Sequence, residues 1–148
     1  MRIIVDTNIV FSALLNSNSK ISKILMHSKE HFQFFSCSFL KKEINKHRNK
    51  LLKLTKLNTE QLIELEELVT KHIEFIDENL IPKEILTQTE LQLINIDVND
   101  TVFVALTTYL EGRLWTGDLQ LHKGLKAKQY KNVILTSELS LLLDDLEH

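Results

Sequence analysis

The amino-terminal segment constrains the fold of this 148-residue chain more than any other stretch of its sequence. Residues 3–5 are consecutive β-branched aliphatics, a run that is typical of a strand buried on both faces in a parallel sheet. The polar residues Asp6, Thr7 and Asn8 follow directly. Because these side chains cannot stay in the apolar layer, we expect them at the carboxyl end of the strand, where open α/β sheets form ligand crevices. Taken alone, Asp6 or Thr7 has an alternative role as the cap of the following helix.

Strand-like and helix-like segments alternate along the rest of the chain. We expect further strands at residues 32–35, 73–76, 114–116 and 133–135, and helices that begin near residues 9, 21, 39, 58, 82, 97 and 137. The helix from Phe39 is expected to run to about Leu54. This alternation predicts an α/β fold with a parallel sheet covered by helices on both faces. We expect a single domain over residues 1–148, with a helical segment at about 58–93 and a remnant of an expression tag at 146–148.

Composition excludes several classes of protein. No apolar run approaches the roughly 18 residues of a membrane span, and residues 3–5 are too short for the apolar part of a signal peptide. The lone Cys37 excludes an internal disulfide and is typical of a reducing cytoplasm, where we expect the protein. We interpret this thiol as a small apolar side chain and not as a nucleophile.

The net charge of −2 conceals a segregation of charges along the chain. Basic residues crowd residues 41–56 and 123–131, whereas residues 60–111 are strongly acidic. This distribution predicts a local nucleic-acid footprint, although a solvated helix face is the alternative for each basic run. The residues that we expect to contact RNA phosphates are Lys42, Lys46, Arg48, Lys50 and Lys123.

Four acidic residues stand where a predicted element meets the expected crevice. Asp6 and Asp118 each follow a strand, Asp100 begins a helix, and Glu43 borders the inward face of another helix. If the strands are parallel, Asp6 and Asp118 project from the same edge of the sheet. Each acid also has a local alternative: the aspartates can cap helices, as can Asp97, and Glu43 can pair with a lysine one turn away.

Several carboxylates within a few ångströms of one another need protons or a cation to offset their repulsion. Hard oxygen ligands without a histidine or cysteine cluster favour Mg²⁺ or Mn²⁺, and the six histidines show no ligand spacing. Such a site beside a basic surface suits hydrolysis of phosphodiester bonds, in which the metal activates a water molecule. We find no motif for a side-chain nucleophile or for a glycine-rich phosphate loop.

Four segments together resemble the successive motifs of the PIN domain family, which includes VapC-like ribonuclease toxins and PilT amino-terminal-like domains. They are residues 4–8 (IVDTN), 38–44 (SFLKKEI), 97–106 (DVNDTVFVAL) and 114–118 (LWTGD). The resemblance implies a Rossmann-like three-layer α/β/α fold with a mainly parallel sheet of four to five strands. It also implies an Mg²⁺- or Mn²⁺-dependent endoribonuclease. The implied acidic quartet is Asp6, Glu43, Asp100 and Asp118, with Asp6, Asp100 and Asp118 as metal ligands and Asn8, Thr116 and Asp97 in support.

Small bacterial members of that family commonly serve as toxins, so the resemblance further implies RNA as substrate, an antitoxin protein as partner, and a homodimer. Two other readings stay open. One is a catalytically silent PIN-fold module that binds RNA or a protein, although a polyanion binder gains nothing from clustered acids. The other is a phosphatase with Asp6 as nucleophile, which is disfavoured because Asn8, two residues on, cannot serve as a general acid.

Overall fold

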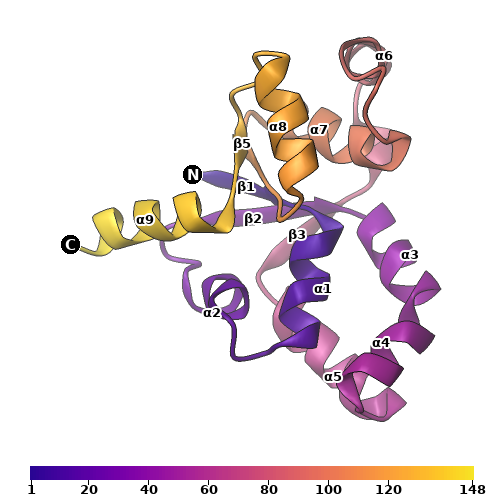
Figure 1. The fold of residues 1–148 in the computed structure, drawn as a ribbon, viewed down its shortest axis with the longest axis vertical. Coiled ribbons are helices and arrows are strands. Elements are labelled where there is room, and N and C mark those ends of the chain that lie inside the picture. Colours follow the sequence, from indigo (N-terminus) through magenta and orange to yellow (C-terminus); the bar gives the residue numbers. More distant parts are fainter.

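The computed structural model describes residues 1–148, in which five strands alternate with helices (Figure 1). The strands are β1 (Arg2–Val5), β2 (Gln33–Cys37), β3 (Ile73–Ile76), β4 (Arg113–Trp115) and β5 (Val133–Ile134). The helices are α1 (Thr7–Leu15), α2 (Lys20–His27), α3 (Phe39–Lys46), α4 (Arg48–Thr55), α5 (Thr59–Thr70), the 3-10 turn η1 (Glu78–Leu80), α6 (Lys83–Gln92), α7 (Val98–Leu110), α8 (Leu119–Ala127) and α9 (Thr136–Glu147).

All five strands form one parallel sheet in the order β3-β2-β1-β4-β5. The aliphatic run of β1 occupies its centre, and Ile3, Ile4 and Val5 are fully buried. Trp115 of β4 is buried as well and stacks obliquely near Phe34 of β2, with ring centroids 6.1 Å apart. The predicted parallel α/β fold is therefore confirmed, with strands buried on both faces as their apolar sequences require.

Helices cover the sheet on both faces and produce a three-layer architecture. In Figure 1, α1, α2, α4 and α5 lie below the sheet, whereas α6, α7 and α8 lie above it. Helix α7 packs over β1, β2 and β4, and α1 packs against α2, α4 and α5. The carboxyl edge of the central strands is thus framed by the start of α1, the start of α7 and helix α3.

One predicted helix differs from the structure. The helix expected from Phe39 to Leu54 is broken at His47, whose backbone leaves the helical region (φ −103°, ψ 15°) and whose ring packs edge-on against Phe11. This break is set by packing, because the local sequence contains neither proline nor glycine. Within the segment at about 58–93, the strand expected at residues 73–76 is confirmed as β3, which pairs with β2 and forms one edge of the sheet.

The remaining expectations concern the carboxyl terminus and the cysteine. Residues Leu146 and Glu147 belong to α9 and not to an unstructured tail. Cys37 is a buried free thiol at the end of β2, and burial raises its pKa to about 12. At neutral pH the thiol is therefore protonated and unreactive, as its interpretation as an apolar side chain requires. No helix has the length and apolar character needed to cross a membrane.

Candidate active site

The ends of β1 and β4 define the position of the candidate site. These strands are parallel neighbours in which Val5 pairs with Trp115, and the N–H of Asp6 continues the ladder to the carbonyl of Trp115 at 3.1 Å. The chain leaves β1 toward β2 on one side of the sheet and later returns to β4 on the other. Crevices at the carboxyl edge of a parallel sheet form where the strand order reverses in this way. Asp6 and Thr116, the residues that follow the two strands, are buried at this edge and hydrogen-bonded to each other.

Asp6 is a buried carboxylate held by three donors. It is only 3% exposed, and its Oδ1 accepts the N–H of Thr7 at 2.7 Å. Its Oδ2 accepts the hydroxyl of Thr116 at 2.8 Å and the amide of Asn8 at 3.2 Å. Burial raises the pKa of Asp6 to about 6, aided by the charges of Glu43 and Asp118, although the hydrogen bonds from Thr116 and Thr7 act in the opposite direction.

The two supporting residues link Asp6 to Asp118. Asn8 accepts the N–H of Gly117 at 2.9 Å, and Thr116 accepts the N–H of Asp118 at 3.1 Å. One oxygen of Asp118 in turn accepts the N–H groups of Gln120 and Leu121 and so caps α8. Asn8 thus satisfies a backbone donor of the opposite loop, whereas Thr116 satisfies one in its own loop and donates its hydroxyl to Asp6 across the two strands.

Glu43 reaches the same edge from helix α3. Its Oε1 accepts the hydroxyl of Thr7 at 2.5 Å, across 36 residues of sequence. The alternative role of Glu43, an ion pair with a neighbouring lysine, is absent, because the ion pairs of the molecule are Arg48–Glu66 and His122–Glu138. Helix α3 therefore points this carboxylate toward the strand ends, while the lysines on either side are exposed.

The start of α7 brings the remaining acids. Asp97 caps the helix by accepting the N–H of Asn99 at 2.9 Å, and Asp100 lies in its first turn. The pKa of Asp100 is raised to about 7. Burial is the largest cause, and the negative charges of Asp6, Asp97, Asp118 and Glu43 raise the pKa further. The four carboxylates lie near enough to Asp100 for their negative charges to disfavour its ionised form.

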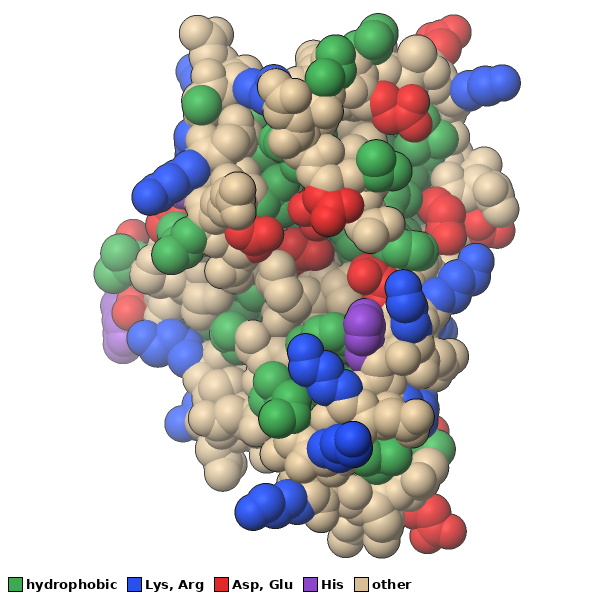
Figure 2. Space-filling model, turned by 45° about the vertical axis from the view of Figure 1, so that its right-hand side comes forward, with side chains coloured by type: hydrophobic (Ala, Val, Ile, Leu, Met, Phe, Trp, Pro, Cys, Tyr) green, Lys and Arg blue, Asp and Glu red, His purple; other side chains and the backbone are tan.

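We call Asp6, Glu43, Asp97, Asp100 and Asp118 the carboxylate cluster. Three of its members, Asp97, Asp100 and Asp118, line a pocket of about 300 Å³ between the start of α7 and helix α8. Figure 2 shows acidic side chains gathered in the middle of one face, with basic side chains mainly on the lower half of that view. The other residues lining this pocket, which we did not predict, are Asn95, Ile96, Gln120, Leu121 and Gly124.

Comparison with known proteins agrees with this geometry. The family model described as PIN domain matches residues 4–138. The chain belongs to the PIN domain family. This match spans all four motif segments.

A solved structure similar to this PIN domain is a chain in the crystal structure of VapBC2 from Rickettsia felis bound to a DNA fragment from their promoter. The TM-score is 0.70 and the sequence identity 17%, and the match covers 91% of this chain and 97% of the other. At this identity the similarity supports the fold alone. A search of the curated proteins gives no match.

The carboxylate cluster fits a hard divalent cation by its chemistry. It offers oxygen ligands only, and the raised pKa values of Asp6 and Asp100 reflect a concentration of negative charge that a dication would offset. The side chains are nevertheless spread out: no three acidic, histidine or cysteine residues lie close enough to hold one ion together.

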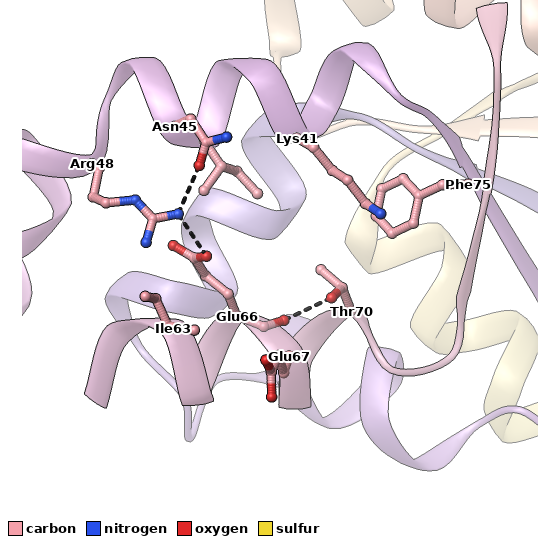
Figure 3. Close-up of a pocket in the computed structure, with 9 residues that line it drawn as sticks. Lys41, Asn45, Arg48, Ile63, Glu66, Glu67, Thr70 and Phe75 are labelled. Carbon is pink, nitrogen blue, oxygen red and sulfur yellow. Dashed lines mark hydrogen bonds and ion pairs between the residues drawn. The ribbon is translucent and has the colours of Figure 1, made fainter. Parts of the chain in front are cut away.

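The residues of this PIN domain that we predicted to contact RNA are either exposed to solvent or paired within the protein. Lys42, Lys46, Lys50 and Lys123 are exposed. Arg48 instead turns toward α5: its guanidinium donates to Glu66 of α5 at 3.0 Å and to Asn45 of α3 at 2.8 Å. Figure 3 shows this pair in a second pocket of about 360 Å³, between α3–α4 and α5.

The same pocket has an apolar floor and a second cation. The ammonium of Lys41 lies 4.3 Å from the centre of the Phe75 ring, which is a cation–π contact. Both cations of this pocket therefore have partners inside the protein. The exposed lysines of α3 and α4 remain the side chains available to an external polyanion.

Sequence reasoning missed one member of the site. We predicted Asn8 and Thr116 as support but considered Thr7 only as a helix cap. The structure shows that Thr7 is buried and that its hydroxyl bonds to Glu43. The polar triplet after β1 was the available signal, but the partner of Thr7 lies on α3 and could not be read from local sequence.

Proposed function

We propose that this PIN domain is a divalent-metal-dependent endoribonuclease, using Mg²⁺ or Mn²⁺, and the toxin of a bacterial toxin–antitoxin pair. The observation that supports it most is the convergence of the carboxylate cluster, in which the pKa of Asp100 rises to about 7 beside four other acids. PIN domains are generally nucleases that use divalent metals. The structural neighbour, a chain of VapBC2 bound to a DNA fragment from their promoter, supports an antitoxin as partner.

In this proposal, Asp6, Asp100 and Asp118 hold the ion. The ion, when bound, supplies Lewis-acid polarisation of a water molecule and of the scissile phosphate. Glu43 completes the site or orients the attacking water, while Asn8 and Thr116 keep Asp6 in place and Asp97 adds negative charge at the start of α7. We expect the protein to act in the cytoplasm as a homodimer.

RNA phosphates would lie along the exposed lysines of α3 and α4, next to the helix that carries Glu43. Lys42, Lys46 and Lys50 are the strongest candidates, with Lys123 on α8 at the other side of the cluster. Arg48 would contribute less, because contact with RNA requires it to leave Glu66.

Replacing Asp100 with Asn tests the nuclease directly. We expect Asp100→Asn to reduce Mg²⁺- or Mn²⁺-dependent cleavage of RNA by about 100-fold or more, because one of the three carboxylates proposed to hold the ion is lost. The measurement is the rate of cleavage of a labelled single-stranded RNA, with and without excess EDTA. Asp145→Asn on α9 is the matched control, because it makes the same substitution on an exposed residue outside the cluster.

Cleavage that persists in Asp100→Asn, or in excess EDTA, would refute the assignment. The second candidate is a catalytically silent PIN-fold module that binds RNA or a protein partner. The spacing of the acids favours it, since no three of them share one ion site as placed. Wild-type protein that binds RNA but neither cleaves it nor gains thermal stability with Mn²⁺ would establish this alternative.

A further inference from the structure

Thr7 lies between two acids that come from different elements. It is the first residue of α1 and is 7% exposed. Its backbone N–H donates to Asp6 at 2.7 Å, and its hydroxyl donates to Glu43 at 2.5 Å. One residue therefore binds a carboxylate at the end of β1 and another on helix α3.

Glu43 is the one acid of the carboxylate cluster whose sole donor is a side-chain hydroxyl from another element. Asp97 and Asp118 are held by the backbone N–H groups of the helices that they cap, and Asp6 has three donors. Glu43 has a longer side chain, forms no ion pair, and is bound by one hydroxyl. Without that hydroxyl, its three side-chain torsions would be free to carry the carboxylate into solvent.

We propose that Thr7 is a positioning residue that holds the carboxylate of Glu43 at the carboxylate cluster and so prepares the site for a divalent cation. The proposal rests on the proposed function. Thr7 is suited to this task because its β-branched side chain has few rotamers and its short hydroxyl is fixed to the rigid start of a helix. Hydrogen bonds that orient a ligand group typically change metal affinity or activity by about 10- to 100-fold when they are removed.

The decisive substitutions separate the hydroxyl from the shape of the side chain. Thr7→Val keeps the β-branch and removes the donor, whereas Thr7→Ser keeps the donor and removes the methyl group. Thr107→Val is the matched control: Thr107 is 1% exposed and its hydroxyl donates to the carbonyl of Phe103 at 2.8 Å, within α7. If Thr7→Val does not fold, Thr7→Ala removes the same hydroxyl with less bulk.

Three measurements follow. We expect Thr7→Val to weaken Mn²⁺ binding in isothermal titration calorimetry by about 10- to 100-fold and to lower kcat for RNA cleavage with little change in KM. Thr7→Ser should stay close to wild type, and Thr107→Val should alter thermal stability without altering Mn²⁺ affinity. In the metal-free protein, NMR couplings of Glu43 should show one side-chain rotamer in wild type and averaging in Thr7→Val.

A double-mutant cycle tests whether Thr7 acts through Glu43. In a Glu43→Gln background, Thr7→Val should cause no further loss of Mn²⁺ affinity, because the two changes disable the same group. Independent, additive losses would overturn the proposal, as would a single Glu43 rotamer in Thr7→Val. The NMR measurement also distinguishes failure of the proposed nuclease activity from failure of the role proposed for Thr7. Wild-type protein that neither binds Mn²⁺ nor cleaves RNA would refute the nuclease activity. The Glu43 rotamers in wild type and in Thr7→Val would still show whether Thr7 positions Glu43.

Discussion

At the scale of single residues, three aspartates of the carboxylate cluster have two tasks. Asp6, Asp97 and Asp118 each accept a backbone N–H at the start of a helix, and each also adds charge to the shared crevice. A carboxylate can do both because it has two oxygens and one suffices for the cap. Helix capping and a place among the clustered acids were alternatives in the sequence, but in the structure these aspartates do both, because these helices begin at the carboxyl edge of the sheet.

The raised pKa values predict how the metal-free protein responds to pH. Asp6 and Asp100 have pKa values of about 6 and about 7 in the folded protein, against 3.8 for an unperturbed carboxyl group. Folding therefore favours their protonated forms. The stability that they contribute is fully present below about pH 4 and is lost as the pH rises through 6 to 7. For the buried Asp6, a shift of roughly two units corresponds to about 3 kcal/mol at most.

Asp100→Asn provides the test of this pH dependence. At about pH 8 in EDTA, we expect the variant to unfold at a higher temperature than wild type, because it lacks the repelled charge, and the difference should vanish near pH 4. Adding Mg²⁺ at about pH 8 should stabilise wild type more than the variant. Asp145→Asn should show neither effect. A variant no more stable than wild type at high pH would contradict the electrostatic coupling of the cluster.

At the scale of elements, the short connection between α7 and β4 sets the relative position of the acids that lie next to these two elements. Helix α7 ends at Glu111, a non-glycine residue in the left-handed region (φ 54°), and β4 begins two residues later. Gly112 occupies the intervening position for reasons of space. A Cβ atom there would lie 2.4 Å from Cδ1 of the buried Ile4 and 2.8 Å from the carbonyl oxygen of Arg2. The absence of a side chain allows α7 to turn directly into the sheet.

Two glycine-to-alanine substitutions should therefore have opposite effects on stability. We expect Gly112→Ala to lower the free energy of unfolding by about 1–3 kcal/mol, because a backbone oxygen cannot move away as a flexible side chain could. Gly124 lies within α8, and its added Cβ would meet Ile96 at an ordinary 3.6 Å. Gly124→Ala should leave stability unchanged or raise it by up to about 1 kcal/mol. Urea denaturation of both variants measures the difference, and equal effects would show that the junction tolerates a side chain.

At the scale of the whole molecule, sheet topology gathers distant segments and separates the charges. Because β1 lies between β2 and β4, the ends of the first and fourth strands meet at one edge, with α3 and α7 on either side. The exposed lysines of α3 and α4 flank this edge. Arg48, one of the basic residues of the stretch at 41–56, forms an ion pair with Glu66 of the acidic helix α5. Fewer basic side chains are therefore available to an external polyanion than the sequence of this stretch indicates.

Charge reversal tests which basic residues contact RNA. In the Asp100→Asn background, which keeps the RNA intact, Lys46→Glu with Lys50→Glu should weaken binding and reduce the slope of log affinity against log salt by about 1.4, or about 0.7 for each lost phosphate contact. Lys20→Glu with Lys23→Glu on α2 is the control of equal charge change, and both of those lysines are exposed. If both pairs have the same effect, binding reflects net charge and not a local footprint.

The sequence alone determined the parallel α/β fold, the buried first strand and the acids at its edge, because periodicity and strand-end polarity are local properties of the chain. The tertiary structure decided the rest. It set the break at His47, the pairing of Arg48 with Glu66, the bond from Thr7 to Glu43, and the spacing that keeps any three acids from sharing one ion. These features depend on how helices far apart in sequence pack against one another, and no local pattern of residues encodes that distance.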